Sequence, residues 1–100
     1  MKSFTVTGDT PEKFMRKVER ALYKGELGKF SKMVLAMPDA KIAFEKMGVT
    51  EFSFKISQDG ETFTAQKVDE KVAVTHIFFR NEVERELERI IARFGGTIKK

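Results

Sequence analysis

The sequence of 100 residues contains no cysteine, no tryptophan and a single histidine. Without cysteine the chain can form neither disulfides nor thiolate metal sites, and it has no cysteine nucleophile. Small secreted domains usually depend on disulfides, so their absence favours an intracellular protein. The N-terminal segment also has no apolar run typical of a signal peptide, and no segment approaches the apolar length of a membrane span. We therefore expect a cytoplasmic protein with no membrane partner.

The scarcity of histidine and cysteine also limits the catalytic and metal-binding chemistry that the chain can support. His76 lies among apolar residues, and a lone histidine there is more often packed and hydrogen-bonded than catalytic. A metal site would have to use carboxylates, and the glutamates at 82, 84, 86 and 88 diverge by about 200° per two residues around a helix. Phosphate-loop and dinucleotide motifs are absent. We expect no metal and no cofactor, and a protein that is not an enzyme.

Asparagine and glutamine are rare as well, whereas lysine and glutamate are abundant. This composition is typical of heat-adapted proteins. With 41% hydrophobic and 34% charged residues, the chain has the composition of a folded protein with a highly charged surface. Its length suits one domain spanning residues 1–100.

The first half predicts one strand followed by helices. Residues 2–7 alternate between apolar and polar, as in a half-buried strand. Thr10 and Pro11 are suited to the N-cap and first position of a helix, whose apolar stripe follows at helical spacing. The glycines of Gly25-Glu26-Leu27-Gly28 predict the end of that helix rather than a nucleic-acid-gripping loop. Residues 29–37 and 40–47 have the same helical spacing, and we expect residues 26–47 to form two short helices, or one helix bent at Pro38.

The second half predicts a three-stranded meander and a helix. Residues 51–57, 62–66 and 71–79 alternate with period two, with an Asp-Gly turn at 58–60 and a second turn near 69–70. We place the strand at 71–79 centrally, because it is apolar on both faces at its end. Residues 81–94 predict an amphipathic helix that Asn81 and Glu84 would cap and two glycines would end. Residues 97–100 would be a basic tail or an edge strand.

These segments predict an α+β fold with the order β-α-α-β-β-β-α. The expected architecture is a two-layer sandwich, in which a mostly antiparallel four-stranded sheet has helices packed on one face.

A basic row on the first helix is one candidate site. The net charge of +4 lies wholly in residues 1–50, where ten basic residues outnumber six acidic ones; residues 51–100 have nine of each. Part of this excess follows helical spacing and could neutralise several phosphates of a nucleic acid. The same pattern is also typical of a lysine-rich solubilising surface. The candidate nucleic-acid-binding residues are Lys13, Arg16, Lys17, Arg20 and Lys24.

The second candidate site is an apolar interruption of the polar sheet face. If 71–79 is a strand, Ile77 and Phe79 share a face with threonines and other polar side chains. An apolar patch on such a face favours a partner or a second copy of the chain. The alternative is that a loop or residues 97–100 cover this patch.

Three hypotheses about function follow. The first is a non-enzymatic interaction or assembly module that self-associates as a homodimer. The second is a nucleic-acid-binding protein that uses the basic first helix. The third is a carrier of a small hydrophobic ligand in a pocket lined by phenylalanine and methionine.

Overall fold

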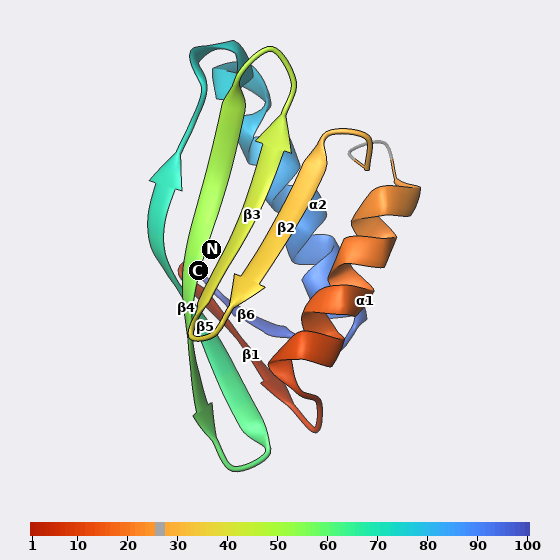
Figure 1. Ribbon diagram of the computed structural model, residues 1–100, viewed down its shortest axis with the longest axis vertical. Helices are drawn as coiled ribbons and strands as arrows, with labels where there is room; N and C mark the ends of the chain where they lie inside the picture. Colours follow the sequence, from red (N-terminus) through yellow and green to blue (C-terminus); the bar gives the residue numbers. More distant parts are fainter. Residues whose placement is uncertain (26–27) are drawn as a thin grey trace.

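A single antiparallel sheet forms the frame of the protein (Figure 1). The computed structural model describes residues 1–25 and 28–100, and within these ranges the sheet has six strands in the order β2-β3-β4-β5-β1-β6. The strands are β1 (Ser3–Thr7), β2 (Ser31–Ala36), β3 (Asp39–Glu45), β4 (Val49–Asp59), β5 (Thr62–Lys71) and β6 (Thr97–Lys99). The protein is therefore α+β, as predicted, but with six strands rather than four.

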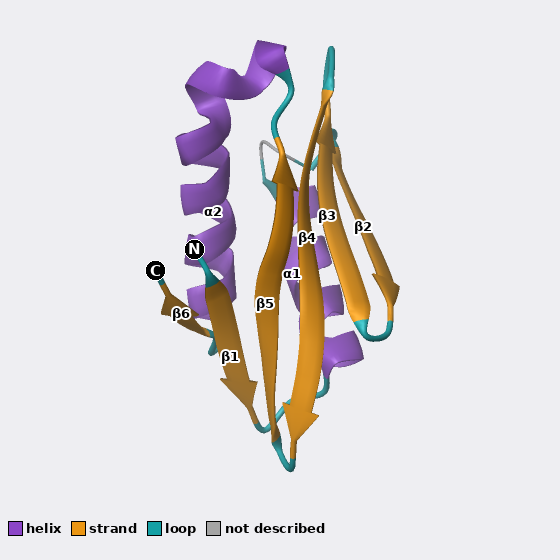
Figure 2. Cartoon of the chain, turned by 90° about the vertical axis from the view of Figure 1, so that its left-hand side faces the viewer, coloured by secondary structure: helices purple, strands orange, loops and turns teal. Residues whose placement is uncertain are grey.

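Two α-helices lie against one side of the sheet (Figures 1 and 2). They are α1 (Pro11–Lys24) and α2 (Arg80–Arg93), and a 3-10 helix, η1 (Val74–Phe79), leads directly into α2. Thr10 caps α1 as predicted, because its hydroxyl accepts a hydrogen bond from the amide of Lys13 at 3.2 Å. Within the described ranges, no helix is long and apolar enough to cross a membrane.

Phenylalanine rings fill the space between the sheet and the helices. The ring of Phe4 stacks on Phe14 of α1 at 5.9 Å between centroids and meets Phe54 and Phe63 edge-on. Alternate residues of the strands supply one side of this core, and α1 and α2 supply the other. The completely or almost completely buried side chains include Phe4, Phe14, Phe52, Phe54, Phe63, Leu22, Ile42, Leu87, Ile91 and Val18.

The two helices expected at 29–37 and 40–47 are wrong: these residues form β2 and β3. In β3, Ala40, Ile42 and Phe44 are buried while Asp39 and Lys41 are exposed, so the apolar positions also fit period two. The strand assignment prevails because β4, with its buried face, needs a hydrogen-bonding partner on each edge. β3 pairs with β4 from Asp39↔Lys55 to Glu45↔Val49, and β2 extends the sheet beyond it.

The strand expected at 71–79 and the turn near Asp69-Glu70 are also wrong. β5 continues without a turn to Lys71, and a register shift opposite Ser53 and Phe54 accommodates the extra residue. The chain then leaves the sheet and forms η1, so no strand at 71–79 lies in the centre of the sheet.

Residues 81–94 form a helix as predicted, although the capping box is wrong. α2 begins one residue earlier, at Arg80, and its N-cap Phe79 makes no side-chain hydrogen bond. The side chain of Asn81 accepts a bond from Arg80 at 3.0 Å instead. Beyond α2, the segment predicted as a tail or an edge strand is the edge strand β6, paired with β1. Part of the predicted glycine terminator, residues 26–27, lies outside the described residues.

Candidate functional site

Five large apolar side chains are exposed at one end of the molecule, on η1 and the turn between β3 and β4 (Figure 1). We call this surface the apolar end; it comprises Met47, Val74, Ile77, Phe78 and Phe79. The exposed fraction is 90% for Phe78, 86% for Met47 and 82% for Val74. Single exposed apolar residues are common on proteins, but a contiguous group of this kind is typical of an interaction site.

Hydrogen bonds from buried Thr50 attach η1 to the sheet. Thr50, at the start of β4, is 2% exposed, and its hydroxyl oxygen accepts a bond from the amide of Ala73 at 3.1 Å. The same hydroxyl donates to Nδ1 of His76 at 2.6 Å. Nε2 of His76 lies 2.6 Å from the carbonyl oxygen of Lys46. Because a carbonyl can only accept, Nε2 donates to it, and in the neutral ring Nδ1 then accepts from Thr50.

Gly48 allows η1 to approach the β3–β4 turn closely. Its φ is +141°, a value that residues with a side chain rarely adopt. A Cβ at this position would lie 2.7 Å from the hydroxyl of Thr75 and 2.9 Å from Cβ of Ala73. Thr75 in turn donates to the carbonyl oxygen of Met47 at 2.8 Å. The apolar end is thus held in place at three positions close together in the sequence, 73, 75 and 76.

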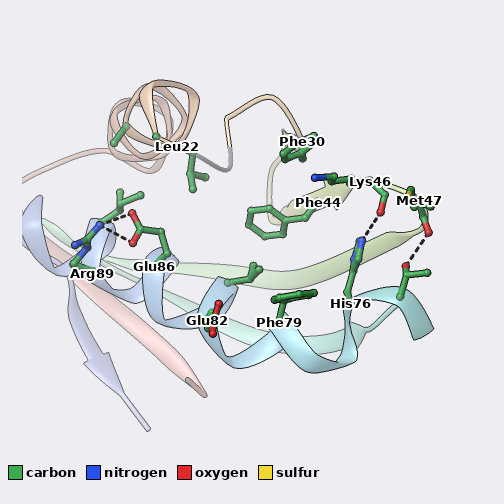
Figure 3. Close-up of a pocket in the computed structure, with 15 residues that line it drawn as sticks. Leu22, Phe30, Phe44, Lys46, Met47, His76, Phe79, Glu82, Glu86 and Arg89 are labelled. Atoms are coloured by element: carbon green, nitrogen blue, oxygen red, sulfur yellow. Dashed lines mark hydrogen bonds and ion pairs between the residues drawn. The ribbon is translucent and has the colours of Figure 1, made fainter.

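A groove begins beside the apolar end and runs between the helices and the sheet (Figure 3). Its volume is about 810 Å³, within the range of binding clefts. α1, α2, η1 and the end of β3 all contribute to its walls. The apolar part of the lining comprises Ala21, Leu22, Phe30, Phe44, Met47, Phe79, Val83 and Ile90.

Charged side chains stand on both sides of this groove. Lys46 lies beside Phe30 and Phe44, with its ammonium 4.6 Å from the centroid of the Phe30 ring (Figure 3). Glu82 lies on the α2 side, near Phe79. Farther along α2, Glu86 and Arg89 neutralise each other at 2.6 Å.

A second charged cluster fixes α2, and with it one wall of the groove, to β5. Lys67 on β5 lies 2.8 Å from Glu84 and 2.7 Å from Glu70, and Arg80 also contacts both glutamates. The hydrogen bond from Arg80 is the largest influence on Glu70, whose pKa falls to about 2. Burial opposes the charge of Lys67, but its bonds to Glu70 and Glu84 outweigh burial and raise the pKa of Lys67.

Ile77 and Phe79 do not lie on the polar face of the sheet, which corrects the prediction. The chain leaves the sheet after Lys71, so both residues belong to η1 and the apolar end. The outer face of the sheet carries polar side chains on β1 and β5, where the hydroxyl of Thr5 contacts that of Thr64 and the hydroxyl of Thr7 contacts that of Thr62. The role of Ile77 and Phe79 in an interface stays a prediction.

Sequence analysis missed Phe78, Val74 and Met47. The signal for Phe78 was the run Ile77-Phe78-Phe79, which is too apolar for a strand with one face in water. Met47 was assigned to a helical stripe, whereas it lies in the β3–β4 turn with φ +54°. The exposure of Met47 depends on the pairing of β3 with β4, so it could not be predicted from the neighbouring residues alone.

The basic residues expected on the first helix are all exposed on α1. Phe14, Val18 and Leu22 face the core, so the opposite face of the helix carries the basic row. Lys17 is paired with Asp9 at 2.9 Å, and this bond lowers the pKa of Asp9. The exposed members are Lys13, Arg16, Lys17, Arg20 and Lys24.

No group of three or more His, Cys, Asp or Glu side chains that could hold a metal ion occurs in residues 1–25 and 28–100. The candidate site is the apolar end together with the adjoining groove, because exposed apolar side chains and a recess lie side by side there. Comparison with known proteins identifies no matching family model, no matching curated protein and no matching solved structure.

Proposed function

We propose that the protein is an interaction module that self-associates through the apolar end. The observation that carries this proposal is the exposure of Phe78, Val74 and Met47, which are the least buried large apolar side chains of the described residues. Burying a side chain of this size stabilises a complex by about 1.5–3 kcal/mol before the costs of association are counted. A surface with several such side chains is therefore suited to a stable contact.

The attachment of the apolar end to the sheet also supports an interaction role. An apolar segment that moved freely would lose conformational entropy on binding, and this loss would weaken the complex. Here the bonds from Thr50, His76 and Thr75 hold the surface in one arrangement before any partner arrives. Both ring nitrogens of His76 are engaged in this attachment. In this geometry the histidine has a structural role.

The experiment compares Phe78→Ser with Tyr23→Ser by size-exclusion chromatography with light scattering over a wide range of concentrations. Tyr23 is a suitable control because it is also aromatic and exposed, at 77%, but lies on α1. The wild type and Tyr23→Ser should reach twice the chain mass of 11.5 kDa, and Phe78→Ser should stay at the mass of one chain. Circular dichroism would verify that both variants are folded. A wild-type protein that stays monomeric at every concentration would refute the proposal.

A second candidate function is nucleic-acid binding by α1, favoured by the exposure of its five basic side chains on one face. Each phosphate contact would add to the salt dependence of binding, because counterions are released. The double variant Lys13→Glu/Arg20→Glu should abolish binding to a fluorescent single-stranded RNA at low salt. A control of equal charge change, Lys55→Glu/Lys71→Glu, should retain most of it. Wild-type protein that does not bind at low salt would exclude this function.

A further inference from the structure

We propose that the groove receives the apolar end of a second copy of this chain, so that two chains exchange Phe78 reciprocally about a two-fold axis. The inference rests on the proposed self-association and specifies its geometry. In a two-fold interface each chain presents the same surface, so a projection on that surface needs a recess on the same surface to receive it. The apolar end provides the projection, and the groove provides the recess.

The two features adjoin on the same chain. Phe79 belongs to both, because it lies on η1 and also lines the groove (Figure 3). Phe78, the residue before it, does not line the groove of its own chain and is the most exposed phenylalanine, at 90%. A ring in that position can enter the groove of a second copy, where Phe30 and Val83, which line the groove and are only partly buried, offer apolar contact.

The area of the surface fits a dimer. At their observed exposures, the five side chains of the apolar end present on the order of 600 Å² of apolar surface. A specific interface of ordinary size buries about 800 Å² on each partner. Each chain would also bury the walls of its groove, which adds to this area. A single apolar end resting on a flat surface would leave the groove uncovered.

The charges of the groove are self-complementary. Lys46 stands on the β3 side and Glu82 on the α2 side, both are exposed, and neither forms an ion pair with another residue in the described part of the chain. A two-fold arrangement can bring Lys46 of each copy to Glu82 of the other, which forms two equivalent ion pairs. A purely apolar small ligand would leave both charges beside its binding site without a partner.

The test is a charge exchange between chains. In Lys46→Glu, a homodimer would face two glutamate–glutamate contacts, and in Glu82→Lys it would face two lysine–lysine contacts. Each variant alone should therefore dimerise about tenfold or more weakly than the wild type. A mixture of the two variants should form heterodimers with near wild-type affinity, because both contacts then join opposite charges. Native mass spectrometry separates the three species when one variant carries a mass tag.

Two controls accompany this experiment. The pair Lys55→Glu and Glu61→Lys makes the same charge changes in β4 and in the β4–β5 turn, at residues that do not line the groove. Mixing these variants should give no preference for heterodimers. The double variant Lys46→Glu/Glu82→Lys should dimerise on its own, which would show that the substituted side chains still allow folding.

The outcomes distinguish this inference from the proposal on which it rests. A monomeric wild type would refute self-association altogether. A wild-type dimer whose affinity is unchanged in Lys46→Glu and Glu82→Lys would refute the reciprocal exchange and leave self-association through another surface. A small molecule that co-purifies with the protein, and that Phe30→Ser removes without unfolding the chain, would also refute it and assign the groove to a ligand.

Discussion

His76 lies 2.6 Å from Thr50, and this contact between Nδ1 and Oγ1 joins the segment before α2 to the start of β4. The two residues are 26 positions apart in the sequence. Thr50 is buried, and its hydroxyl also accepts a bond from the amide of Ala73, so one hydroxyl holds both the residue before η1 and the third residue of η1. This hydroxyl is therefore one of the polar groups that set the position of the apolar end.

Replacing Thr50 by valine should therefore destabilise the protein by about 1–3 kcal/mol. Valine has nearly the shape of threonine, but it leaves the Ala73 amide and Nδ1 of His76 without their partner. Urea unfolding measures the loss, and amide exchange at Ala73 should become faster. Thr64→Val, on the outer face of the sheet, should change stability by no more than about 0.5 kcal/mol. Equal effects of the two substitutions would contradict the role assigned to Thr50.

Gly48→Ala should displace η1 and weaken self-association. Besides the strain of its φ of +141°, the added Cβ would collide with Thr75 and Ala73. Gly60→Ala is a matched control: Gly60 also has positive φ, +62°, but its Cβ would meet no atom within 4 Å. We expect the control to cost about 1–2 kcal/mol of folding stability and to dimerise normally. Light scattering and thermal unfolding of both variants test this, and a normally dimerising Gly48→Ala would refute the expectation.

Two glutamates of α2 should differ strongly in their contribution to stability. Glu84 is 8% exposed and contacts both Lys67 and Arg80. Glu84→Ala leaves two partly buried cations with less compensation and should cost about 3–5 kcal/mol. Glu86→Ala removes a surface pair with Arg89 and should cost at most about 1 kcal/mol. Chemical denaturation of the two variants compares them directly, and a small effect at Glu84 would show that the cluster does not hold α2.

Acid should weaken the protein through Glu70. The pKa of Glu70 is about 2 in the folded chain, against an ordinary value of 4.5, chiefly because Arg80 donates hydrogen bonds to it. The unfolded chain therefore takes up this proton at a higher pH than the folded chain does. The stabilisation from Glu70 is complete above pH 4.5 and is lost as the pH falls towards 2.

Glu70→Gln should make the unfolding free energy fall less steeply over this interval, although the variant is less stable at neutral pH. Urea unfolding of the variant and the wild type at a series of pH values gives the two slopes. Glu84, whose pKa is also lowered, remains in both proteins, so the variant should retain part of the acid dependence. Identical slopes would show that Glu70 is not responsible for the acid dependence.

The sequence by itself determined the elements whose signals are local. Thr10 and Pro11 define the start of α1, the apolar stripe of residues 81–94 defines α2, and the Asp59-Gly60 pair defines the hairpin between β4 and β5. In each case the cap, turn or period lies within a few residues and needs no distant partner. The basic row on α1 was predictable for the same reason, because the buried stripe fixes which face of a helix is exposed.

Only the tertiary structure decided the segments at 29–47 and 71–79, and with them the candidate site. The apolar residues of β2 and β3 fit both helical and strand periods, and the edge of β4, which must bond to a neighbour, selected the strands. Beyond Lys71 the alternation of apolar and polar residues would fit a strand. Contacts with Thr50 and with the turn at Gly48, both distant in sequence, hold the segment away from the sheet instead. Backbone hydrogen bonds and close packing between segments far apart along the chain outweigh local preference, and these contacts placed Phe78 in solvent beside the groove.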